Sequence, residues 1–163
     1  MPWPARPGQR AYCHVFLPWS AQTQFKASGV YPLPWEFQVA ATYQNLAGFP
    51  DAASFVATNS QIAPSLGRNL GQCGTSATCN GTATISSLFA PNTIFEDRLS
   101  QLDLRFTKIV RVGRARVQGM FDIYNLFNSS TILSINSRYG PTWLQPTTIL
   151  GARLFKFGAQ FDF

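Results

Sequence analysis

Charged residues are scarce in this chain. They make up 12% of its 163 residues, whereas hydrophobic residues make up 45% and aromatic residues 14%. The charged share is about half of the roughly 25% that is usual in globular domains. A soluble protein needs a charged surface, so this scarcity indicates an exterior that faces something other than water. The sequence also lacks a run of about 18 apolar residues, which excludes a transmembrane helix. A membrane protein built from strands fits, because its apolar side chains occupy alternate positions.

Clusters of basic or catalytic residues are also missing. The net charge is +6, from 13 Lys and Arg against 7 Asp and Glu, but the positive residues stand singly, so we expect no nucleic-acid binding. The adjacent carboxylates Glu96 and Asp97 would point to opposite faces of a strand. The single histidine, His14, has no recognisable triad partner, and glycine-rich phosphate motifs are absent. We therefore predict neither an enzyme nor a cofactor or metal site.

Only three cysteines are present: Cys13, Cys73 and Cys79. The last two flank a five-residue polar segment, so we expect a small disulfide formed in an oxidising compartment. Zinc is the alternative, but it would need further Cys or His nearby. Cys13 is then unpaired or pairs outside this chain. The N-terminal residues contain no apolar signal-peptide core, and we expect the chain to be part of a longer exported protein.

Alternation of apolar and polar side chains predicts five antiparallel strands. The first two, residues 23–31 and 36–44, flank a turn at Pro32–Trp35, where two prolines would interrupt a strand. The third and fourth, residues 99–111 and 117–124, flank a turn at Val112–Gly113. The last strand is the clearest, because it alternates phenylalanine and alanine with polar residues up to the C-terminus.

The connections between these strands alternate between short and long. Besides the two tight turns, we expect an irregular segment over residues 1–22 and long loops over residues 45–92 and 128–148, the first of which has room for a small hairpin. Helical spacing is absent, so no helix layer is expected to cover the apolar side of the sheet. Such a sheet is typical of a β-barrel wall that faces lipid. Aromatic residues would then mark its two rims, namely Tyr31 and Trp35 at one, and Tyr43 and Tyr124 near the other.

Three segments of the chain resemble a known family. They are Arg98-Leu-Ser-Gln-Leu-Asp-Leu-Arg-Phe-Thr-Lys108, Val117-Gln-Gly-Met-Phe-Asp-Ile-Tyr-Asn-Leu-Phe-Asn128, and Gly151-Ala-Arg-Leu-Phe-Lys-Phe-Gly-Ala-Gln-Phe-Asp-Phe163. Together they are similar to the last strands of bacterial TonB-dependent outer-membrane receptors. The similarity is greatest to receptors with a carboxypeptidase-regulatory-like N-terminal domain, which also have a segment like Tyr139–Pro146. The resemblance covers most of residues 10–163.

The resemblance implies that the chain is the C-terminal part of an up-and-down transmembrane β-barrel in the bacterial outer membrane. Such receptors have about 22 strands around a plug domain and import a ligand with energy relayed by the TonB system. The implied partners are outer-membrane lipid, the rest of the barrel and its plug, the TonB system and the barrel-assembly machinery. That machinery would recognise the terminal strand through Phe155, Phe157, Phe161 and Phe163. No plug and no energy-coupling box is present, and five strands would form an open sheet.

Polar residues of the strands would face the barrel lumen, either touching plug or ligand or forming an ordinary hydrated wall with cross-strand pairs. They are Asp103, Arg105, Gln118, Asp122, Lys156 and Gln160. Two other functions compete with a transporter fragment. One is a structural or adhesive outer-membrane barrel, which would lack the plug. The other is a soluble β-sandwich that binds carbohydrate through loop Trp and Tyr residues, which would need more surface charge.

Overall fold

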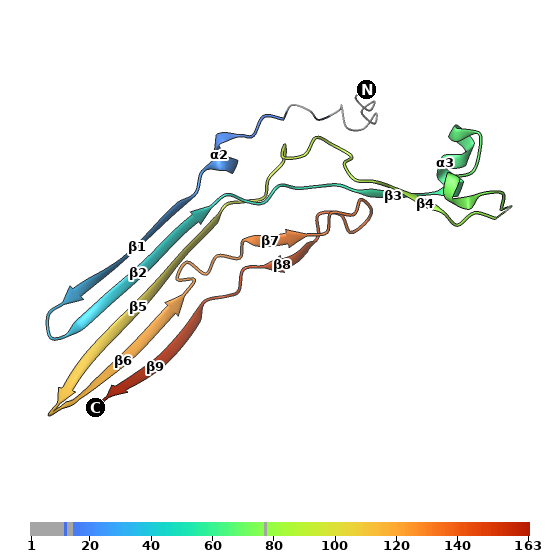
Figure 1. Ribbon diagram of the computed structural model, residues 1–163. Helices are drawn as coiled ribbons and strands as arrows, with labels where there is room; N and C mark the ends of the chain where they lie inside the picture. Colours follow the sequence, from blue (N-terminus) through green and yellow to red (C-terminus); the bar gives the residue numbers. More distant parts are fainter. Residues whose placement is uncertain (1–11, 13–14, 77) are drawn as a thin grey trace, which may run out of the picture. The chain divides into compact units, whose positions relative to one another are not determined.

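A computed structural model describes residue 12 and residues 15–76 and 78–163 of the chain. Antiparallel strands dominate these residues, and the helices among them are short (Figure 1). The all-β, antiparallel architecture predicted from the alternation of side chains is therefore confirmed. The chain divides into two compact units. The sheet unit contains residues 18–49, 96–134 and 148–163, and the loop unit contains the described residues of 1–17, 50–95 and 135–147.

The sheet unit is built on one five-stranded antiparallel sheet. Its strands are β1 (Phe25–Leu33), β2 (Phe37–Leu46), β5 (Leu99–Val112), β6 (Ala115–Tyr124) and β9 (Leu154–Asp162). They lie side by side in the order β1-β2-β5-β6-β9, so their order in the sheet is the same as their order along the chain (Figure 1). The sheet is open, because β1 and β9 each pair with one strand only.

The pairing register sorts the side chains of this sheet onto two chemically different faces. Directly paired residues share a face, and alternate residues of a strand share a face. One row across the sheet runs through Tyr31, Val39, Phe106, Phe121 and Phe157. We call the face that carries this row the apolar face. The opposite face carries Ala40, Arg105, Asp122 and Lys156 in one row, and we call it the polar face.

Large side chains of the apolar face are exposed. Phe157 keeps 79% of its surface accessible, Tyr31 69% and Phe161 65%. The aromatic rings still contact their neighbours within the face, because the ring centroids of Phe121 and Phe157 lie 4.8 Å apart and those of Phe106 and Phe121 lie 6.4 Å apart. The apolar face of this single sheet is therefore a continuous, mostly apolar surface.

The two tight turns lie at one end of the sheet, together with the C-terminus (Figure 1), but their positions differ from the predicted ones. The first turn occupies Pro34–Glu36 and the second Gly113–Arg114. Pro32 is part of β1 and pairs with Gln38, so the prediction that it would end the strand was wrong. Proline lacks a backbone N–H, but an edge strand tolerates it where that position faces away from the neighbouring strand. The second turn needs Gly113, whose φ of 62° is strained for other residues.

The loop unit contains regular structure where the sequence predicted one long loop with room for a hairpin. Strands β3 (Phe55–Thr58) and β4 (Thr82–Ile85) pair antiparallel. Between them lie helix α3 (Asn59–Leu66) and the short helix η1 (Gly71–Cys73). These two short helices were not predicted from the sequence. The local signals are a Thr58–Gln61 capping box, in which Gln61 accepts the Thr58 N–H at 2.9 Å, and a left-handed Gly67 at the end of the helix.

Three further short elements lie in or beside segments predicted to be irregular. Helix α2 (Trp19–Gln22) precedes β1. Strand β7 (Ile132–Ile135) lies within the predicted loop 128–148 and pairs with β8 (Pro146–Ile149), which ends one residue beyond that loop. Four-residue strands with few alternating positions are weak sequence signals, which explains why β7 and β8 were missed. None of the helices in the described part of the chain is long and apolar enough to cross a membrane.

Candidate functional site

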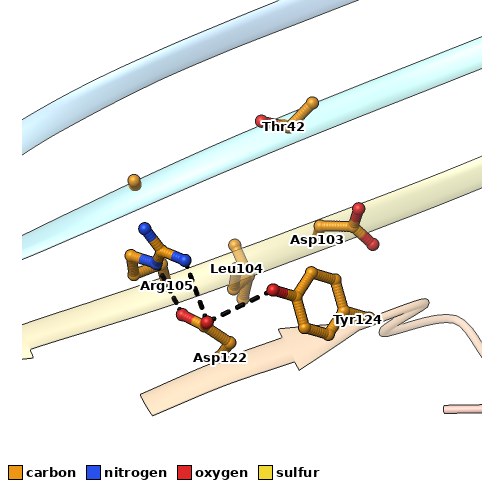
Figure 2. A pocket seen from close by; sticks show the side chains of 7 residues that line it. Thr42, Asp103, Leu104, Arg105, Asp122 and Tyr124 are labelled. Atoms are coloured by element: carbon orange, nitrogen blue, oxygen red, sulfur yellow. Dashed lines mark hydrogen bonds and ion pairs between the residues drawn. The ribbon is translucent and has the colours of Figure 1, made fainter. Parts of the chain in front are cut away.

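A charged cluster on the polar face joins β5 to β6. Arg105 donates from Nε to Asp122 Oδ1 at 2.6 Å and from Nη2 to Asp122 Oδ2 at 2.9 Å. The Tyr124 hydroxyl donates to the same Oδ2 at 3.2 Å. Figure 2 shows the guanidinium and the phenol both directed at the carboxylate. Such a two-point ion pair fixes both the position and the plane of the guanidinium.

Small side chains on β2 leave a hollow beside this cluster. Arg105 pairs across the sheet with Ala40, and Asp103 pairs with Thr42. The hollow has a volume of about 240 Å³ and is lined by these four residues together with Leu104, Asp122 and Tyr124 (Figure 2). The Asp122 side chain is 6% exposed, whereas that of Arg105 is 48% exposed. A ligand in the hollow would therefore meet the guanidinium, while the carboxylate holds that guanidinium in place.

The turn after β6 extends the cluster toward the end of the sheet. Asp103 Oδ1 accepts the backbone N–H of Asn125 at 2.8 Å and a side-chain N–H of Gln101 at 2.9 Å. Asn125 is almost fully buried and has a left-handed φ of 51°. Its amide donates to the carbonyls of Ser129 and Gly151, and its Oδ1 accepts the Ser129 N–H. Asn125 thereby ties the end of β6 to the segment that leads into β9.

The six residues predicted to line a lumen all lie on the polar face, in two groups. Asp103, Arg105 and Asp122 belong to the cluster described above, and Lys156 is paired with Asp122 across β6 and β9. Gln118 and Gln160 pair with each other nearer the tight turns. Gln160 donates to Asp162 Oδ1 at 3.0 Å and Gln118 donates to Asp162 Oδ2 at 3.5 Å, so both glutamines bind one carboxylate at that end of the sheet.

Two members of the cluster were not identified from the sequence. Tyr124 was predicted only as an aromatic residue near one rim; in the structure it lies on the polar face, where its hydroxyl donates to Asp122. Tyr124 is the last residue of β6 and comes two positions after Asp122. Because alternate residues of a strand share a face, the sequence already places both side chains on one face. Asn125 was passed over, although asparagine is the residue that most readily adopts a left-handed turn conformation besides glycine. The sequence Tyr124-Asn-Leu-Phe-Asn128 carries that signal.

The aromatic residues of the terminal strand lie on the apolar face. Phe155, Phe157 and Phe161 pair with Ile123, Phe121 and Val117 of β6, and Phe163 follows the last residue of β9. All four are more than half exposed. Their outer strand edge is unpaired within the sheet.

The loop unit holds the remaining candidate residues. Cys73 and Cys79 form a disulfide with Cα atoms 5.4 Å apart, whereas Cys13 and His14 lie outside the described residues. Asp51 is buried, and its Oδ1 has no hydrogen-bond partner. Burial raises the pKa of this carboxyl above its usual value. Within the described residues no group of three or more His, Cys, Asp or Glu side chains is arranged to hold a metal ion.

Comparisons of this chain with protein-family models, with curated proteins and with solved structures found no significant match.

Proposed function

We propose that this chain is a wall segment of a bacterial outer-membrane β-barrel, and that the barrel is a receptor of the TonB-dependent type that imports a ligand. The apolar face would meet lipid, and the polar face would meet the lumen. The observation that carries this proposal is the pairing of an exposed aromatic face with a hydrogen-bonded polar face on one sheet.

Hydrophobic energetics support a lipid-facing role for the apolar face. Ten large apolar side chains on this face are at least 39% exposed: Phe25, Tyr31, Leu33, Phe37, Phe106, Val110, Val112, Phe155, Phe157 and Phe161. Moving about ten such side chains from water into hydrocarbon is favourable by on the order of 10 kcal/mol. Soluble monomers rarely keep so large an apolar patch in water. Lipid satisfies this face without a second protein layer.

Hydrogen bonding supports closure into a larger barrel. Hydrocarbon offers no partner to an unpaired backbone N–H or C=O, so strands cross membranes only in closed barrels. The outer edges of β1 and β9 are unpaired in this five-stranded sheet. We propose that further strands of the same barrel pair with both edges. With the tight turns on the periplasmic side, the long connections would lie outside the cell.

The transport role rests on the resemblance of the β5, β6 and β9 segments to the last strands of TonB-dependent receptors. In such a receptor, the Arg105–Asp122–Tyr124 cluster would line the lumen, where it would contact the plug or the ligand. The plug, the TonB system and the barrel-assembly machinery are the proposed partners. A coding sequence for a plug and an energy-coupling box in frame with this chain would support transport over a purely structural barrel.

A matched pair of substitutions in β9 tests the membrane assignment. Phe157→Arg places a charge on the apolar face, and Gln160→Arg places the same charge on the polar face of the same strand. An arginine at the bilayer midplane of a barrel costs about 2–4 kcal/mol when it faces lipid. We therefore expect Phe157→Arg to lower the fraction of protein that floats with vesicles of phosphatidylcholine and phosphatidylglycerol, and Gln160→Arg to leave that fraction nearly unchanged.

The unmodified chain provides the decisive control. If it purifies without detergent as a monodisperse monomer and does not float with vesicles, the membrane assignment is wrong. Equal effects of the two arginine substitutions would likewise contradict the assignment of one face to lipid.

A further inference from the structure

A hollow of about 350 Å³ lies across the apolar face near the tight-turn end. It spans β2, β5, β6 and β9, and we call it the Lys108 groove. Its lining residues include Phe37, Phe106, Lys108, Gly119, Phe121 and Phe157. The groove exists because glycine occupies position 119. A Cβ atom there would meet no other atom within 4 Å, so the space is open.

One side of the groove is an aromatic wall. Phe106, Phe121 and Phe157 are successive residues of one cross-strand row, and their rings are stacked, with interplanar angles of 25° and 26° between neighbours. The neighbouring row contains Lys108, Gly119 and Ala159, so small residues follow the lysine across the sheet. An open channel beside stacked rings is a suitable surface for an alkyl chain.

Lys108 is the one charged residue on the apolar face of the five strands, every residue of which lies in the described part of the chain. Its Nζ is 4.2 Å from the centroid of the Phe37 ring and donates to the Trp35 carbonyl. These contacts hold the ammonium at the level of the first tight turn, because Phe37 is the first residue of β2. An ammonium has three N–H donors, and the Trp35 carbonyl uses one of them.

A cation on a lipid-facing surface is unfavourable unless an anion or water is close by. At the rim of a bilayer, the anions available are lipid phosphates. We propose that the Lys108 groove binds one anionic phospholipid, with its phosphate at Lys108 and an acyl chain against Gly119 and the aromatic wall. The proposal rests on the proposed function, since it requires this face to meet lipid. It adds a specific lipid site at one position of the wall.

Fluorescence quenching by brominated lipids tests the site, because Trp35 lies next to Lys108. The protein carries Trp35 as its single tryptophan, with the other three replaced by phenylalanine. It is incorporated into phosphatidylcholine vesicles that contain equal mole fractions of either brominated phosphatidylglycerol or brominated phosphatidylcholine. We expect the apparent association of the phosphatidylglycerol near Trp35 to be higher by about fivefold, the ratio that corresponds to one basic residue at an anionic surface.

Matched variants distinguish lipid binding in the groove from a general attraction of anionic lipid to basic residues. Lys108→Gln should abolish the preference for phosphatidylglycerol, whereas Lys108→Arg should keep it. Arg114→Gln removes a charge from the neighbouring turn and should also keep it. Gly119→Leu fills the groove and should reduce the preference. Gly29→Leu, at another open position of the same face, should leave it unchanged.

The outcomes distinguish this proposal from the function on which it rests. Equal quenching by the two brominated lipids would overturn the lipid site while leaving the membrane assignment standing. So would equal losses in Lys108→Gln and Arg114→Gln, or an unchanged preference in Gly119→Leu. If neither brominated lipid quenches Trp35, the apolar face does not meet lipid, and the proposed function fails as well.

Discussion

Removing the charge of Asp122 should weaken the contact between β5 and β6. Asp122→Asn keeps the size and shape of the side chain, and one oxygen can still accept from Tyr124. The substitution replaces one carboxylate oxygen by an NH₂ group. One N–H of Arg105 then faces another donor instead of an acceptor. Hydrogen bonds to charged groups contribute about 1.5–3 kcal/mol, which sets the upper limit for the loss of one such bond.

Solvent reduces that magnitude. The Asp122 side chain is 6% exposed, but that of Arg105 is 48% exposed, so the guanidinium regains water when its partner is lost. Partly exposed ion pairs are worth less than buried ones, and we expect Asp122→Asn to lower the free energy of unfolding by about 1 kcal/mol. Asp162→Asn is the matched control on the same face. Its exposed carboxylate accepts from glutamine side chains, and surface substitutions of this kind change stability by less than about 0.5 kcal/mol.

Urea unfolding of the vesicle-bound protein, followed by tryptophan fluorescence, measures both variants. A double-mutant cycle with Arg105→Gln then isolates the pair. If Asp122→Asn and Asp162→Asn shift the unfolding free energy equally, or if the coupling between Arg105 and Asp122 is zero, the ion pair does not stabilise the sheet.

Three further predictions concern single features of the chain. Burial raises the pKa of Asp51 in the folded state, so the folded state favours the protonated form. The stabilisation is complete below the unfolded pKa and is lost as the pH rises through the folded pKa. In urea unfolding, Asp51→Asn should therefore match the parent protein at pH 3 and exceed its stability at pH 8, and an identical difference at both values would contradict the assignment. Asn125→Ala should lower the unfolding free energy by about 2 kcal/mol, because it removes several buried hydrogen bonds and places alanine at a left-handed φ. Asn125→Gly relieves the strain but loses the same bonds, so a fully stable glycine variant would show that the bonds contribute nothing. Reducing the Cys73–Cys79 disulfide should destabilise the loop unit by at most about 2 kcal/mol, because the closed loop is short. Limited proteolysis should then accelerate within residues 71–81, and faster cleavage within β5 or β6 instead would show that the disulfide supports the sheet.

The five long strands could be predicted from the sequence because apolar and polar side chains largely alternate along each of them. When apolar residues recur at every second position along a whole strand, they all lie on the same face, so the sequence determines which face is apolar. The short elements β3, β4, β7, β8 and α3 lacked that repetition. In α3 the capping residues Thr58 and Gln61 were informative, but Pro64 and the many small polar residues nearby favoured the prediction of a loop.

The candidate site was predictable only in part, for a geometric reason. Alternation placed Asp103, Arg105 and Asp122 on one face, and the tight turn made their strands neighbours, but the sequence does not reveal the register in which the strands pair. The register brings Arg105 opposite Asp122 and leaves Gln118 and Gln160 in a separate group. Tyr124 and Asn125 join the cluster because β6 ends beside Asp103, a consequence of the same register.

Local side-chain chemistry by itself determined that this chain forms antiparallel strands with one apolar and one polar face, because the pleat of a strand sends alternate residues to opposite sides. The register of the strands was decided only by the tertiary structure, since it depends on which backbone groups of facing strands form hydrogen bonds with each other. Those pairings placed Lys108 beside Gly119 on the apolar face and Arg105 beside Asp122 on the polar face.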